Sequence, residues 1–109
     1  MCTMDEAVVI MQEAYHETNQ IMPIQDAWLY GSYARGDYRP DSDVDILLLT
    51  PLSQSEINRK QWDIAGVASD LSLDHDVTVS VIVRPIDAFQ PEMSLYFANV
   101  AKDGIKMLA

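Results

Sequence analysis

The stretch GSYARGDYRPDSDVDILLL, residues 31–49, decides most of what this sequence predicts. It ends in the apolar run Ile46–Leu49, which is typical of a buried strand. Asp43 and Asp45 come just before that run, and residues two apart on a strand point to the same face. Carboxylates beside a buried strand are costly unless something pairs with them. The identity of that partner is therefore the first question that the sequence raises.

The spacing of the two aspartates fits a divalent cation. Two steps along a strand span about 6.6 Å, so both carboxylates can reach one or two metal ions. Oxygen-rich sites select Mg²⁺ or Mn²⁺, and Mg²⁺ usually binds one or two carboxylates together with substrate phosphates. A solvated turn that leads into a strand would explain a bare Asp-x-Asp equally well. The residues upstream favour the metal site.

Those upstream residues have the chemistry of a phosphate site. Gly31 follows a short apolar segment, and a glycine there lets the backbone approach a phosphate closely. Ser32 adds a hydroxyl, and a helical turn over 33–35 would add free backbone amides. An ordinary turn explains Gly-Ser alone. Gly-Ser and Asp-x-Asp together, ten residues apart, predict the two halves of a nucleoside triphosphate site.

Composition and charge narrow the class of protein. The chain has 109 residues, which is enough for one modest core, so we expect a single domain over 1–109. Its net charge of −10 disfavours non-specific binding to nucleic acid. Cys2 is the only cysteine, no basic leader precedes the first apolar stretch, and no apolar run is long enough to span a membrane. These features predict a cytoplasmic protein that does not enter membranes.

Periodicity predicts an α/β or α+β fold in which helices cover one face of a sheet and leave the other face open. Thr3 with Glu6, and Ser53 with Glu56, have the spacing of helix capping boxes. The expected elements are, in chain order, a helix over 5–17, a strand that stops at Gly31, a helical turn over 33–35, a strand over 44–49, a long helix that opens at Ser53, a strand over 76–83, a helix over 92–102 and an edge strand within IKMLA, residues 105–109.

The strand over 76–83 alternates strictly between its two faces. We expect one face to be buried under helices and the other to be polar and open. The buried face would hold Val77, Val79, Val81 and Val83, and the open face Asp76, Thr78, Ser80 and Ile82.

The stretch over 31–49 resembles the signature of the DNA polymerase beta-like nucleotidyltransferases, and within them the minimal (MNT) branch. That signature is Gly-Ser, ten residues and Asp-x-Asp, often with Ala-Arg-Gly after the serine and Ser-Asp before the aspartates. This chain has both additions, at residues 34–36 and 42–43. The resemblance implies a polymerase beta-like core with a small mixed sheet.

The resemblance also implies a two-metal nucleotidyl transfer that uses Mg²⁺, or Mn²⁺ in its place. The family has a third carboxylate on a neighbouring strand. Asp76 is the best match, with Asp74 as the second choice. The implied catalytic and metal-binding residues are Asp43, Asp45 and Asp76, and the implied nucleotide-binding residues are Gly31, Ser32, Arg35 and Ser42.

Minimal members of the family lack the domain that recognises an acceptor. Several are paired with HEPN-domain proteins as toxin and antitoxin, and adenylylate that partner on tyrosine. The resemblance therefore implies ATP as the substrate, a HEPN-type protein as the partner and an antitoxin role. Two alternatives stay open. The chain could modify a cationic small molecule such as an aminoglycoside, with a second copy of the chain completing the acceptor site. It could also be a binding module that inhibits its partner without catalysis.

Overall fold

A computed structural model describes residues 2–107 of the chain. It has the α/β class that the sequence predicts, with a mixed sheet. The elements are, in chain order, α1 (Met4–Asn19), β1 (Asp26–Tyr30), α2 (Ser32–Arg35), β2 (Val44–Thr50), α3 (Gln54–Arg59), α4 (Gln61–His75), β3 (Val79–Pro85), the 3₁₀ turn η1 (Ile86–Ala88), α5 (Leu95–Asp103) and β4 (Ile105–Lys106). Within residues 2–107, no helix combines the length and the apolar character needed to cross a membrane.

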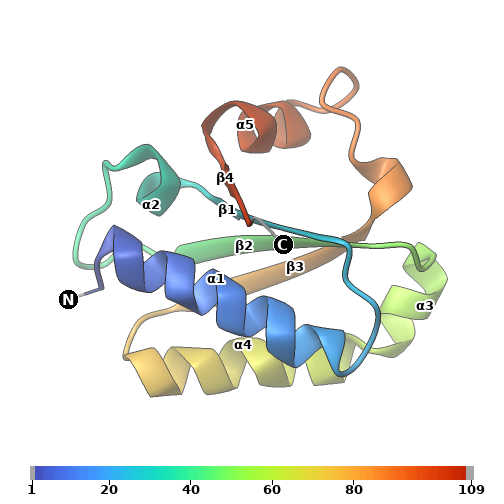
Figure 1. Ribbon diagram of the computed structural model, residues 1–109, viewed down its shortest axis with the longest axis horizontal. Coiled ribbons are helices and arrows are strands. Elements are labelled where there is room, and N and C mark those ends of the chain that lie inside the picture. The colour runs from blue at the N-terminus through green and yellow to red at the C-terminus, as the bar shows by residue number, and fades with distance from the viewer. Residues whose placement is uncertain (1, 108–109) are drawn as a thin grey trace.

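The four strands form one sheet in the order β3-β2-β1-β4. Strand β1 is antiparallel to both β2 and β4, whereas β2 and β3 are parallel. A parallel pair needs a long crossover, and helices α3 and α4 provide it. Figure 1 shows β2 and β3 running side by side above α4. This topology places the start of β2 next to the start of β3 and the end of β1.

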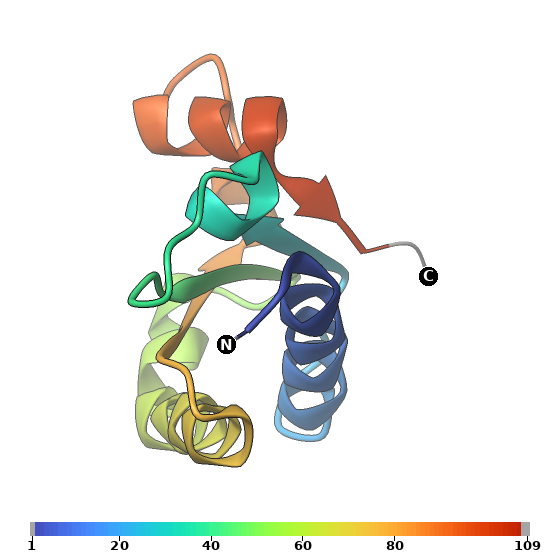
Figure 2. The ribbon, with the colours of Figure 1, turned by 90° about the vertical axis from the view of Figure 1, so that its left-hand side faces the viewer.

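Helices lie on both faces of the sheet, as Figures 1 and 2 show: α1 and α4 on one face and α5 on the other. The reason is the run over 46–49, which is apolar at both parities and therefore buries β2 on both faces. Ile46 and Leu48 belong to the main core under α1 and α4, whereas Leu47 and Leu49 pack with Val100 of α5 in a smaller core. The second face is thus open only at the end of β2 that carries the aspartates.

Local signals placed most helices correctly. The Thr3 hydroxyl accepts a hydrogen bond from the Glu6 backbone N–H at 3.1 Å, and Ser53 with Glu56 forms the complete capping box. Two boundaries differ from the prediction. The long helix after Ser53 is broken at Lys60 into α3 and α4, and the last helix begins at Leu95 with Ser94 as its cap. Only residues 105–106 of the expected edge strand are in β4, and residues 108–109 lie outside the described residues.

The face of β3 that holds the valines is buried as the sequence predicts, whereas the other face is open only in part, because Ile82 packs in the smaller core under α5. Val79 and Val83 are buried in the main core, and Val77 and Val81 pack against it. On the other face, Thr78 is exposed. The strand itself starts three residues later than expected, at Val79.

Val79→Ala is expected to lower the free energy of unfolding by about 1–3 kcal/mol, because it removes buried methyl groups and leaves a cavity. Thr78→Ala should cost much less, since the Thr78 side chain is exposed. Urea denaturation of both variants would measure the difference. A larger cost for Thr78→Ala would mean that the register of β3 is shifted by one residue.

Candidate active site

Asp43 and Asp45 lie at the uncovered end of the sheet. The Val44 backbone N–H between them donates to the Thr78 carbonyl at 2.8 Å, which ties the start of β2 to β3. Asp45 is paired with Tyr30 of β1 on one side and with Ser80 of β3 on the other. Residues paired across strands share a face, so these three side chains form one row on the face of α5. Asp45 is half-buried in that row, and Asp43 is exposed.

The turn after β1 touches the Asp45 carboxylate directly. Gly31 has φ +78° and ψ −155°, a conformation that essentially only glycine adopts. A Cβ added to Gly31 would collide with Oδ2 of Asp45 and would lie 3.4 Å from its Cγ. Glycine is therefore required here for two independent reasons. The contact brings the two halves of the 31–49 motif together in space.

Helix α2 is a single turn, as predicted, and Tyr33 fixes its position. The Tyr33 side chain is fully buried and stacks on Tyr38, with ring centroids 4.4 Å apart and planes within 14°. Burial, together with the neighbouring Cys2, raises the pKa of Tyr33 to about 12, so its phenol stays neutral. The Arg35 backbone N–H donates to the Gly31 carbonyl at 3.1 Å and closes the turn. Ser32 is thus held at the start of an anchored segment.

Among the described residues, neither Asp43 nor Asp45 forms an ion pair. Burial is the largest cause that raises the pKa of Asp45, and the charge of Asp43 raises it further. The positive charge of Arg35 acts in the opposite direction and offsets part of the rise in the pKa of Asp45. A divalent cation would remove the repulsion between the carboxylates. The donor set of two carboxylates and nearby hydroxyls fits Mg²⁺ or Mn²⁺, which prefer oxygen ligands.

The raised pKa of Asp45 predicts how stability depends on pH. An aspartate in the unfolded chain has a pKa of about 3.9. Between that value and the higher native value the folded protein binds more protons, so its free energy of unfolding falls as pH rises. The contribution of Asp45 is fully present below about pH 4 and is lost as pH rises through the native pKa. Urea unfolding of the wild type and Asp45→Asn, without metal and from pH 4 to 7, should show the wild type losing stability relative to the variant. A difference that stays constant with pH would contradict this account.

Two other predicted nucleotide-binding residues have partners within the loop. The Ser42 hydroxyl oxygen accepts the Arg39 backbone N–H at 2.8 Å, and the Ser42 N–H donates to the Arg39 carbonyl at 3.0 Å. These bonds close the turn that leads into Asp43. The Arg35 guanidinium forms an exposed ion pair with Asp37 at 3.3 Å. Ser42 therefore shapes the loop, and Arg35 is the cation whose charge lowers the pKa of Asp45.

The prediction that Asp76 heads the third strand is wrong. Asp76 is the C-cap of α4, exposed and in the left-handed conformation with φ 52°, which Asp tolerates better than most residues. Asp74, the second choice, is exposed on α4 itself. Within residues 2–107 the structure brings together no cluster of three His, Cys, Asp or Glu side chains that could hold a metal ion. The residue beside Asp45 on β3 is Ser80.

Asp76→Gly is expected to raise the free energy of unfolding by about 0.5–1 kcal/mol, because glycine adopts the left-handed C-cap without the cost of a Cβ. Because Asp76 lies outside the strand that flanks Asp45, its removal should leave any transferase activity unchanged. Denaturant unfolding and a transfer assay on the same variant would test both statements. A tenfold loss of activity in a folded variant would return Asp76 to the site.

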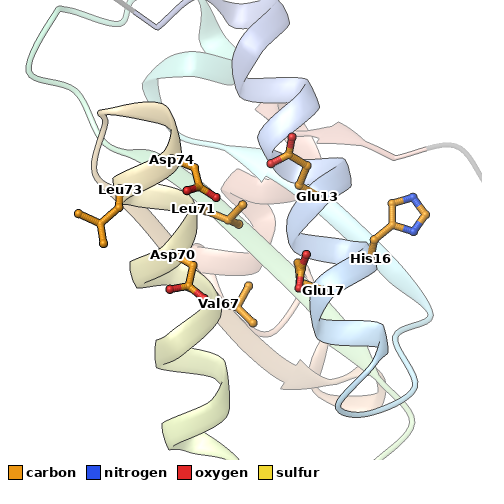
Figure 3. A pocket seen from close by; sticks show the side chains of 8 residues that line it. All are labelled: Glu13, His16, Glu17, Val67, Asp70, Leu71, Leu73 and Asp74. Atoms are coloured by element: carbon orange, nitrogen blue, oxygen red, sulfur yellow. The ribbon is translucent and has the colours of Figure 1, made fainter.

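Two cavities help to locate the site. One, of about 450 Å³, lies between α1 and α4 (Figure 3), on the sheet face opposite Asp45. Four acidic residues line this cavity, as Figure 3 shows: Glu13, Glu17, Asp70 and Asp74. Their negative charge would repel a triphosphate. The other, of about 340 Å³, adjoins Gly31 and Arg35 and is closed by one side of α5. The second cavity is continuous with the candidate site.

The residues of α5 that line this second cavity were missed by the sequence reasoning. Tyr96, Asn99, Val100 and Asp103 recur at positions i, i+3, i+4 and i+7, which is one face of a helix. That spacing was visible in the sequence. The sequence did not show that α5 packs on the face of the sheet that carries Asp45, or that these four residues face Gly31.

A family model described as a nucleotidyltransferase domain matches residues 12–105. The chain belongs to the nucleotidyltransferase family. The resemblance seen in the 31–49 motif is confirmed, and this nucleotidyltransferase is a transferase enzyme. It is similar to MJ0141 of Methanocaldococcus jannaschii, provisionally named protein adenylyltransferase: 34% identical over 80 residues, which cover 72% of this chain and 79% of MJ0141. MJ0604 of the same organism, with the same provisional name, is 31% identical over 77 residues, 70% of each chain.

Solved structures share the fold of this nucleotidyltransferase at low identity. A nucleotidyltransferase described from Sulfolobus solfataricus has a TM-score of 0.64 and 20% identity, and covers 94% of this chain and 80% of that one. A toxin–antitoxin structure with AMP-PNP has a TM-score of 0.60 and 18% identity, and the match covers 99% of this chain and 74% of that one. A structure of the Shewanella oneidensis MNT antitoxin in complex with a tri-AMPylated HEPN toxin has a TM-score of 0.52 and 17% identity. The match covers 97% of this chain and 69% of that one. The polymerase beta-like nucleotidyltransferase fold is thereby confirmed.

Proposed function

We propose that this nucleotidyltransferase transfers AMP from ATP to a hydroxyl group of a partner protein. The observation that carries the proposal is the contact between the Gly31 turn and the Asp45 carboxylate. It places a backbone turn that can bind phosphate against a pair of carboxylates that form no ion pair within the described residues. Both lie at one end of the sheet, beside the cavity lined by α5, and the exposed Asp43 side chain marks where an acceptor can approach.

Each residue of the motif has a role in this proposal. The Ser32 hydroxyl and the backbone amides of the turn bind the terminal phosphates, and the Arg35 guanidinium offsets their charge. Asp43 and Asp45 would hold Mg²⁺ or Mn²⁺, and such an ion would supply charge neutralisation for the triphosphate and a lowered pKa for the attacking hydroxyl. Ser42 keeps the loop closed so that Asp43 stays beside Asp45. Together these residues would orient the triphosphate so that an acceptor hydroxyl can attack its α-phosphorus and displace pyrophosphate.

The third position of the site is occupied by a hydroxyl. Ser80 is paired with Asp45 on the same face of the sheet, where neighbouring strands are about 4.8 Å apart. We propose Ser80 as a neutral oxygen ligand or hydrogen-bond donor in place of the carboxylate first expected at Asp76. With two carboxylates at the site, activation of the acceptor depends more strongly on the metal and on groups that the acceptor brings.

The acceptor we propose is a tyrosine of a HEPN-type protein, and the chain would be the antitoxin of that pair. The supporting observations are the fold shared with MNT antitoxins, the similarity to MJ0141 and the net charge of −10, which suits a basic partner surface. A cytoplasmic location belongs to the same proposal, because ATP and such a partner are found there. The test below distinguishes this activity from the alternative, the modification of a small cationic molecule.

The test is incubation of the chain with labelled ATP, GTP, CTP or UTP, Mg²⁺ and the product of the neighbouring gene, followed by mass spectrometry of both proteins. We expect the partner to gain the mass of AMP on tyrosine, only with metal present. A parallel incubation contains the chain alone with an aminoglycoside in place of the partner. Modification of the aminoglycoside would replace the proposal with the small-molecule alternative. Tight inhibition of the partner without any modification would identify a binding module.

A further inference from the structure

We propose that the 340 Å³ cavity between α2 and α5 receives the base of the nucleotide, and that Asn99 and Asp103 select adenine by its 6-amino group, where guanine has an oxygen. The inference rests on the proposed function, because it assumes that the phosphates lie at Gly31 and Ser32. It adds the residues that choose the nucleotide.

The position of the cavity supports this assignment. Gly31 and Arg35 form its wall on the side of the phosphate turn, and Tyr30, the strand partner of Asp45, also lines it. A nucleotide whose phosphates lie at the turn therefore has room for its base beside them. The volume lies within the range of roughly 300–1,000 Å³ that small-molecule sites have.

The walls offer both the stacking surface and the polar groups that a base needs. Tyr96 and Tyr30 meet edge to face with ring centroids 5.5 Å apart, and both line the cavity. Aromatic rings of this kind stack on bases of any sequence. The amide of Asn99 can bind the adenine edge at two points, and the Asp103 carboxylate can accept from an amino group. Guanine presents an oxygen acceptor at that position, which a carboxylate repels.

Asn99 and Asp103 are residue types that destabilise a helix at the positions they occupy in α5. Asn99 is inside α5, where asparagine is among the weaker helix formers. Asp103 is the last residue of α5, where the helix dipole disfavours an acid. Both residues line the cavity. Local choices that weaken an element are expected where a residue serves a site.

A triphosphate is a poor occupant of this cavity, because the Asp103 carboxylate would repel it. The competing occupant is the partner's tyrosine that receives AMP, whose side chain is a large and mostly apolar ring. It would leave the amide of Asn99 and the carboxylate of Asp103 with a single hydroxyl to bind. A base matches both groups, so we assign the cavity to the base.

The experiment measures dissociation constants by displacement of a fluorescent ATP analogue from the full chain in Mg²⁺, with ATP, GTP, CTP and UTP as competitors. The wild type should bind ATP at least roughly tenfold more tightly than GTP. This is the discrimination that one two-point contact between a side chain and a base provides. Asp103→Asn should remove most of this preference by admitting guanine. Asn99→Ala should weaken ATP roughly tenfold and change GTP little. Asp87→Asn, an exposed acid on η1, is the matched control and should change nothing.

Equal affinities in the wild type, or a preference that survives both variants, would overturn the inference while the proposed function stands. Unchanged ATP and GTP binding in variants that no longer modify the partner would assign the cavity to the acceptor and also overturn it. Absence of nucleotide binding under every condition would overturn both the inference and the proposed function. Thermal unfolding of each variant shows that the binding result comes from a folded protein.

Discussion

Asp45→Asn is expected to lower the rate of nucleotidyl transfer by at least roughly two to three orders of magnitude, the loss that follows removal of one charge-stabilising group from an active site. The folded state should be at least as stable as the wild type at neutral pH. The reason is that burial and Asp43 both raise the pKa of Asp45, so the ionised carboxylate destabilises the fold in the absence of metal. Transfer assays and thermal unfolding without metal would measure the two effects.

Asp37→Asn is the matched control, because Asp37 is an exposed acid of the same motif and its one ion pair among residues 2–107 is with Arg35. It should leave transfer within a few-fold of the wild type. If Asp45→Asn unfolded the protein, the aspartate would be a structural residue at the entry to β2. If it kept full activity, the carboxylate pair would not be the catalytic site.

Gly31→Ala should have the second largest effect, on both stability and transfer. Its φ of +78° and ψ of −155° cost a residue with a Cβ about 1–3 kcal/mol. The new methyl group would also displace Oδ2 of Asp45, and a carboxylate moved by about 1 Å can cost roughly a hundredfold in rate. Denaturant unfolding and the transfer assay would report the two losses separately.

Gly66→Ala is the matched control for that substitution. Gly66 lies inside α4, with no neighbouring atom within 4 Å of the position of an added Cβ. The change should raise the free energy of unfolding by about 0.5–1 kcal/mol and leave transfer unchanged. A Gly31→Ala variant as stable and as active as Gly66→Ala would show that the Gly31 turn does not constrain Asp45.

The sequence predicted the parts of the fold that local chemistry determines. The run over 46–49, the alternation of β3 and the caps at Thr3 and Ser53 each depend on residues close together in the chain. The Gly-Ser and Asp-x-Asp pairs could be placed together because their spacing is fixed within one motif. The contact between Gly31 and Asp45 agrees with that expectation.

The rest depended on contacts between distant segments. Asp76 has the parity of Thr78 and Ser80, but α4 continues through His75, which is tied to α1 by a 2.8 Å contact with Glu13. The chain therefore turns at Asp76 before the strand can start. In the same way, the apolar residues on both parities of β2 required a cover on the second face, and only the tertiary structure shows that α5 provides it. The cavity lined by α5 follows from that packing.

In the proposed function, the site built on Asp43 and Asp45 transfers AMP from ATP to a partner protein. The most direct test of this transfer is intact-protein mass spectrometry of the partner after incubation with ATP and Mg²⁺, using the wild type and the Asp43→Asn, Asp45→Asn double variant side by side. We predict that the partner gains the mass of AMP with the wild type, and gains none with a double variant that is folded and still binds it. An equal mass gain with both proteins, or none with the wild type, would contradict the account.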